Sequence, residues 1–181
     1  SRGEQAEKAI LERSERIRRL EELENRLNDW EKVSREREKT QKQYQKAATE
    51  QKQISEQYRK IEQQFWDAQA GMLAQGLKEE EPCPVCGSIH HPILAVIPQE
   101  TPDREVLEQV KAEDEKARET VSRLSEKAHQ LVAQEEEKKT AVLKDAEELL
   151  EETVEKMSLN EIKTQTKRQK SADEARREEY K

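Results

Sequence analysis

Apolar residues along most of this chain recur at intervals of three and four, the spacing that places them on one face of an α-helix. In the first half they form stripes over residues 17–30 and 54–72, and in the second half over residues 106–131 and 142–157. Polar and charged residues occupy most positions between them. The pattern predicts long amphipathic helices whose apolar stripes pack as a coiled-coil seam.

The glycines and prolines predict where the helices stop. Residues 4–70 contain neither type, whereas residues 71–102 hold three of the four glycines and all five prolines, and neither type recurs after that. Because both residue types interrupt helices, we expect two uninterrupted helical arms, 1–76 and 103–181, around an irregular segment, 77–102.

Two arms of nearly equal length favour an all-α fold in which the chain forms one long antiparallel coiled-coil hairpin with a short apex. Both helices rise 1.5 Å per residue, so residues that face each other lie equally far from the turn. If the turn centres near residues 87–90, the numbers of facing residues therefore add to about 176–180. Trp30 would then face Leu149, and Tyr58 would face Val121.

Composition and charge narrow the possible functions. Hydrophobic residues make up 31% of the chain and charged residues 41%, which argues against a large globular core and leaves disorder as the rival to long helices. The net charge of −7 arises from interspersed acidic and basic residues, so we expect no direct contact with nucleic acid. No stretch is apolar enough to cross a membrane. The first residues lack both a signal core and a start methionine, so we expect a piece of a longer protein.

The candidate chemistry lies in the apex. Cys83 and Cys86 are the only cysteines, and their spacing lets both sulfurs bind one metal ion. Pro84 stiffens the turn between them. Gly87 permits the positive φ that turns backbone N–H groups toward the sulfurs. This pattern is typical of a zinc knuckle.

One knuckle supplies two ligands, whereas a structural zinc site takes four. We expect a second copy of the chain to donate the other pair, giving one zinc per homodimer. A site completed locally by His90 and His91 is the alternative, although adjacent imidazoles are difficult to aim at one ion. A redox-active dithiol is a third interpretation. The remaining histidine, His129, is interpreted as a solvated helix residue.

The longest apolar run in the chain follows the cysteines, between Pro92 and Pro98. Its hydrophobic side chains are expected to pack back onto Leu73 and Leu77, to form an apolar dimer contact beside the metal, or to do both. The candidate contact residues are Val85, Ile93, Leu94, Val96 and Ile97.

Residues 82–88 together with His91 and Pro92, set between two long helical arms, resemble the zinc-hook region of the bacterial SbcC family. This family comprises the ATPase subunits of SbcCD nucleases and is related to the SMC-like repair proteins of the Rad type. The resemblance assigns Cys83 and Cys86 as the hook cysteines and Pro84 and Gly87 as the residues that shape the turn. It implies that two hooks share one zinc, in a cytoplasmic complex with an SbcD-like nuclease subunit that processes DNA ends.

The chain itself is not expected to be an enzyme. Its four glycines cannot supply the G-x-x-x-x-G-K-[ST] sequence of a P-loop. The sequence therefore predicts a structural tethering module, and the alternative is a self-contained zinc or dithiol site on a monomeric helical hairpin.

Overall fold

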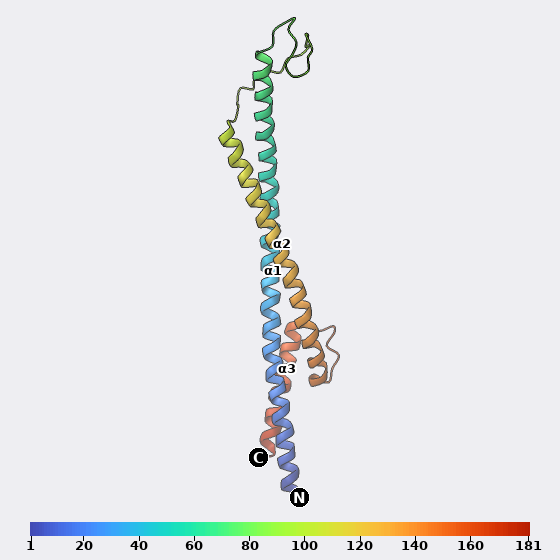
Figure 1. The fold of residues 1–181 in the computed structure, drawn as a ribbon. Coiled ribbons are helices and arrows are strands. Elements are labelled where there is room, and N and C mark those ends of the chain that lie inside the picture. Colours follow the sequence, from blue (N-terminus) through green and yellow to red (C-terminus); the bar gives the residue numbers. More distant parts are fainter. The chain divides into compact units, whose positions relative to one another are not determined.

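The computed structural model describes all 181 residues and contains three helices and no strand, which confirms the all-α class. The helices are α1 (Arg2–Gln75), α2 (Arg104–Leu150) and α3 (Leu159–Glu179), as Figure 1 shows. None of them combines the length and the apolar character that a membrane span requires. The chain divides into two compact units, which we call the three-helix unit (residues 1–42 and 126–181) and the loop unit (residues 43–125).

The three-helix unit holds the main hydrophobic core. Side chains from all three helices and from the segment after α2 meet there, and most of them are fully buried. The core consists of Leu20, Leu23, Leu27, Trp30, Val142, Ala146, Leu149, Leu150, Val154 and Ile162. Burying a side chain of this size contributes roughly 1.5–3 kcal/mol, so this core fixes the relative positions of the three helices within the unit.

The expected uninterrupted second arm is wrong, because the helix stops at Leu150 and restarts at Leu159. Glu151 adopts a left-handed conformation with φ of 53° and ends α2 without a glycine. Ser158 then begins α3 with a capping box: its side chain accepts from the backbone N–H of Glu161, and the Glu161 side chain accepts from that of Ser158. The interruption is favourable because it lets Val154 enter the core.

Helix α3 lies beside a stretch of α1 that α2 also contacts. The ion pair of Arg26 with Asp145 joins α1 to α2, and residue numbers in this pair add to 171. The ion pair of Glu31 with Lys163, at 2.6 Å, joins α1 to α3, and these numbers add to 194. Along two antiparallel helices in a constant register, this sum does not change. It rises here by 23, so 23 residues of the chain have been added without net progress along α1. The segment after Leu150 accommodates this advance by turning back, so that the end of α2 and the start of α3 both pack on α1.

In the loop unit, α1 and α2 run antiparallel, and the segment between them, residues 76–103, is called the connecting loop. Ser55 on α1 donates a hydrogen bond to buried Asp114 on α2. Their numbers add to 169, so the predicted register of 176–180 is wrong by about two to three helical turns. At this register the start of α2 lies level with about residue 65, and α1 extends beyond it to Gln75 (Figure 1).

The register differs because the connecting loop runs back along the end of α1 before α2 begins. Gly71 is the point of closest approach: a Cβ placed there would lie 2.7 Å from the backbone nitrogen of Ile97 and 2.8 Å from the carbonyl carbon of Val96. Only a glycine permits this contact without displacement of the loop. Gly71 therefore positions the loop on α1, rather than ending the helix that contains it.

Candidate metal centre

The connecting loop folds residues 83–91 into two successive tight turns. The backbone N–H of Gly87 donates to the carbonyl of Cys83 at 2.8 Å, and that of Cys83 donates to the carbonyl of Ser88 at 2.9 Å. Gly87 has φ of 77°, as the sequence predicted for this turn. The Ser88 hydroxyl then donates to the carbonyl of His90 at 2.8 Å, which turns the chain back toward the cysteines.

These turns bring three potential metal ligands together. The ligand atoms of Cys83, Cys86 and His91 all lie within 4.8 Å of one another, and His91 Nε2 lies 3.2 Å from Cys86 Sγ. Ligand atoms around a tetrahedral zinc ion are separated by about 3.5–3.8 Å, given its bond lengths to sulfur and nitrogen. The three residues are therefore close enough to bind a metal ion after small side-chain adjustments.

The backbone around Cys83 favours the form of the thiol that binds metals. The N–H group of Cys86, followed by that of Val85, lowers the pKa of the Cys83 thiol, while burial of the sulfur acts in the opposite direction. Hydrogen bonds to the thiolate stabilise its charge. Cys83 is buried and Cys86 is exposed, and both are free thiols.

His91 belongs to this cluster, although the sequence favoured a shared site without it. The sequence predicts that two adjacent imidazoles are difficult to aim at one ion, and the cluster contains only one of the two, His91. His90 is not part of the group. Pro92 disfavours a helical backbone at His91.

The metal-ligand cluster adjoins an apolar cavity of about 240 Å³ between the connecting loop and the end of α1. Leu73 near the end of α1 and Leu77 just after that helix line it, together with Ile93 and Leu94 of the apolar run. The run approaches α1 at Gly71 through the backbone of Val96 and Ile97, whereas the side chains of residues 93–96 are exposed.

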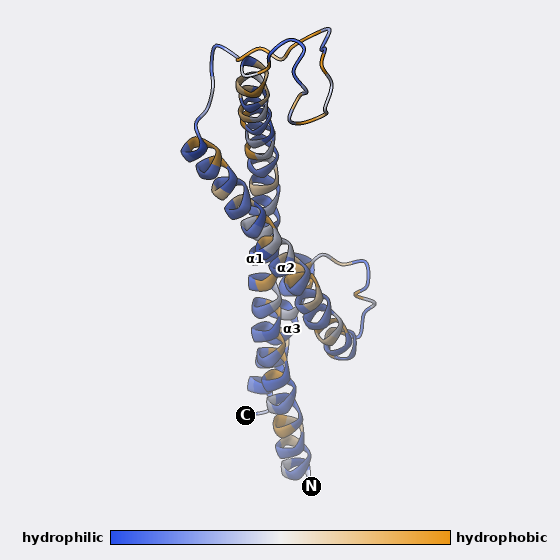
Figure 2. Cartoon of the chain, turned by 45° about the horizontal axis from the view of Figure 1, so that its top comes forward, coloured by the Kyte–Doolittle hydropathy of each residue, from blue (hydrophilic) through white to orange (hydrophobic).

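Much of the apolar surface at this end of the loop unit is nevertheless exposed. Of the twelve exposed large hydrophobic residues in the chain, nine fall between Trp66 and Val106. Ile93 is 90% exposed and Val96 is 80% exposed. Figure 2 shows this hydrophobic character along the connecting loop. An apolar patch of this kind is typical of a protein contact surface.

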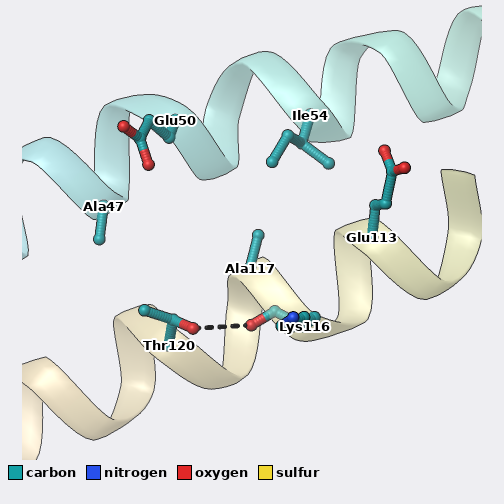
Figure 3. A pocket seen from close by; sticks show the side chains of 7 residues that line it. All are labelled: Ala47, Glu50, Ile54, Glu113, Lys116, Ala117 and Thr120. Carbon is teal, nitrogen blue, oxygen red and sulfur yellow. Dashed lines mark hydrogen bonds between the residues drawn. The ribbon is translucent and has the colours of Figure 1, made fainter.

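A second cavity, of about 290 Å³, lies between α1 and α2 in the loop unit (Figure 3). Ala47 on α1 and Ala117 on α2 face it with short side chains, and Ile54 lines it from α1. The hydroxyl of Thr120 donates to the carbonyl of Lys116, so it is already engaged. The residues that line this cavity include no histidine and no cysteine. They also include no other nucleophile that has a base beside it. We interpret this cavity as a packing gap between small residues.

Comparison with protein-family models, curated proteins and solved structures gives no match to this chain. The assignment of the candidate site therefore depends on the residues of this chain alone. A cluster of two thiols and one imidazole can bind a metal with a preference for sulfur and nitrogen ligands, such as zinc.

Proposed function

We propose that this chain is a tethering module in which the Cys83 and Cys86 thiolates of two copies share one zinc ion. The observation that carries the proposal is the pair of cysteines in one tight turn, with their sulfurs within 4.8 Å. Each chain supplies two thiolates, and a closed structural site takes four. Pro84 and Gly87 shape the turn that presents them.

The exposed apolar surface beside the cysteines supports a second copy as the partner. Val85, Ile93 and Val96 are all largely exposed within the same loop that carries the thiols. Leu94 is half exposed, and Ile97 is partly covered by Gly71 of its own chain. Burial of such side chains against a second copy would add apolar area to the contact that the metal makes.

The wider role follows from the resemblance to the zinc-hook family. The antiparallel helices would form a coiled-coil hairpin that carries the hook at its end. In this proposal the chain is part of a cytoplasmic, ATP-dependent complex that contains an SbcD-like nuclease subunit and processes DNA ends. Residues 77–102 hold one lysine and four glutamates, a local charge of −3, so the hook itself would not bind DNA.

The test is zinc content together with solution mass, measured with half an equivalent of zinc per chain and again in chelator. We expect a dimer with half a zinc per chain that chelator converts to monomer. Replacing Cys83 and Cys86 together by serine should abolish the dimer and leave the helical circular dichroism unchanged. His90→Ala is the control and should dimerise normally. A zinc-dependent dimer of the double serine variant would contradict the shared site.

A self-contained metal site on a monomeric hairpin is the second candidate, because His91 Nε2 lies 3.2 Å from Cys86 Sγ. It predicts a monomer at every zinc concentration, with binding that saturates at one zinc per chain. A redox dithiol would instead leave the chain without zinc and form a Cys83–Cys86 disulfide in mild oxidant.

A further inference from the structure

Each chain carries three metal ligands, yet the shared site uses only two of them. His91 lies in the same group as both cysteines, with its Nε2 atom nearest to Cys86 Sγ. The adjacent turn is fixed by hydrogen bonds within one chain, so the group does not depend on a second copy. The third ligand therefore requires an explanation that the shared site does not give.

We propose that His91 is the third ligand of the metal ion in the unpaired hook and gives up its position when a second copy binds. The proposal concerns the order of events at the shared site, and it rests on the proposed function. Three protein ligands leave one position of a tetrahedral site open, as in sites that exchange ligands. A closed site with four protein ligands would have no such entry point.

The proposed exchange is a substitution of one metal ligand by another and involves no electron transfer. A metal-free second copy presents the thiols of its own Cys83 and Cys86. One thiol displaces the water that would fill the open position, the other replaces His91, and each releases a proton to solvent as it binds. His91 leaves as a neutral imidazole, so the final site has four thiolates from two copies and one metal ion.

The position of His91 suits a ligand that can leave. It is the last residue of the folded segment 83–91, whereas Cys83 is enclosed by the turn and accepts backbone hydrogen bonds. The His91 side chain is partly exposed and Cys83 is buried. His91 can therefore move away without unfolding the turn that holds the two sulfurs.

This arrangement predicts an unusual dependence of dimerisation on metal. At half an equivalent of zinc per chain, one loaded hook meets one empty hook and the dimer forms. At a full equivalent or more, every hook holds its own metal ion through Cys83, Cys86 and His91, and no free thiols remain for exchange. The dimer should therefore reach a maximum near half an equivalent and decline when zinc is in excess.

The experiment is a titration of the full chain with zinc, followed by sedimentation, and a parallel titration with cobalt(II), followed by absorption. The variants are His91→Ala and the control His90→Ala. Loss of an outer-shell partner already weakens metal binding by roughly 10- to 100-fold, so loss of a ligand should weaken binding to the monomer at least as much. The His91→Ala dimer should consequently persist at a zinc excess at least tenfold higher than the wild-type dimer does.

The cobalt spectrum counts the thiolates on each ion. We expect wild type in excess cobalt to give the weaker sulfur-to-cobalt charge-transfer intensity of two thiolates. At half an equivalent it should give the stronger intensity of four. His90→Ala should match wild type throughout.

The possible failures can be told apart. If the dimer forms at half an equivalent and His91→Ala loses it at the same zinc excess as wild type, the role of His91 is overturned and the shared site stands. If no dimer forms at any metal ratio, the tethering function fails and the exchange proposal fails with it. In that case equal cobalt affinity of wild type and His91→Ala would further exclude His91 as a ligand of the monomer.

Discussion

Arg16 donates from its Nε atom to Oδ2 of Asp173 at 2.8 Å, while its Nη2 atom donates to the backbone carbonyl of Leu149. One guanidinium on α1 therefore contacts both the last turn of α2 and the second half of α3. Arg13 adds a second contact, from Nη1 to Asp173 Oδ1 at 2.6 Å. The Asp173 side chain is fully buried, so its two oxygens depend on these arginines in place of water.

Replacing Asp173 by alanine should loosen α3 by removing the acceptor for both arginines. We expect a loss of about 1–3 kcal/mol in the free energy of unfolding. The loss is smaller than for a fully buried pair, because the Arg16 side chain is 24% exposed. Urea denaturation gives the value. Glu22→Ala removes the exposed partner of Arg18 and should cost less than about 1 kcal/mol. Equal losses in the two variants would contradict the structural role of Asp173.

Replacing Ser158 by alanine should weaken the start of α3. The Ser158 hydroxyl accepts from the backbone N–H of Glu161 at 3.2 Å, and the Glu161 side chain accepts in return from the backbone N–H of Ser158 at 2.8 Å. We expect a loss of about 0.5–2 kcal/mol and faster hydrogen exchange in the first turn of α3. Ser171→Ala, at an exposed position within the same helix, serves as the control and should not destabilise the protein. Unchanged exchange in Ser158→Ala would show that the core alone sets this boundary.

Replacing Gly71 by alanine should release the connecting loop from α1. Alanine favours helix over glycine by about 1 kcal/mol, but its Cβ would lie 2.7 Å from the Ile97 backbone. We therefore expect faster protease cleavage within residues 92–98, with α1 still helical. Gly3→Ala meets nothing closer than 3.8 Å and should leave cleavage of the loop unchanged. Equal cleavage rates in the two variants would show that the loop does not pack at Gly71.

The hydrogen bond of Ser55 to Asp114 should make stability depend on pH in the acidic range. The Ser55 hydroxyl, followed by Arg118, lowers the pKa of the Asp114 carboxyl against the opposing effect of burial. A lowered pKa in the folded state means that the stabilisation is complete above the ordinary value of about 3.9. It is lost as pH falls through the folded-state pKa.

Ser55→Ala should therefore raise the Asp114 pKa toward its ordinary value and reduce stability at pH 7 by about 1.5 kcal/mol. The difference from wild type should shrink at a pH below the folded-state pKa of Asp114, where the carboxyl is protonated. NMR titration of the Asp114 carboxyl and urea denaturation at both pH values measure these effects. Ser122→Ala, at an exposed position of α2, is the control. A difference that stays constant with pH would assign the effect to packing instead of charge.

The loop cluster was only partly predictable. The spacing of Cys83 and Cys86 identified both thiols, because residues three apart in a turn stay close in any fold. The sequence places His91 only in the alternative local site, because its approach to Cys86 depends on the turn at Ser88. Ser158 and Glu161 carried a readable capping signal, the S-x-x-E pattern, but no glycine or proline accompanied it.

The sequence by itself determined that the chain is helical and that α1 and α2 are separated by the segment rich in proline and glycine. Those features arise from short-range terms, since φ restriction, helix propensity and periodicity act within a few residues. Only the tertiary structure decided the register of α1 against α2, the break after Leu150 and the burial of Asp173. Each of these depends on contacts between residues far apart in sequence, and several alternative registers satisfy the same apolar spacing. The close approach of Ile97 to Gly71 and the contacts of Arg16 select one of them.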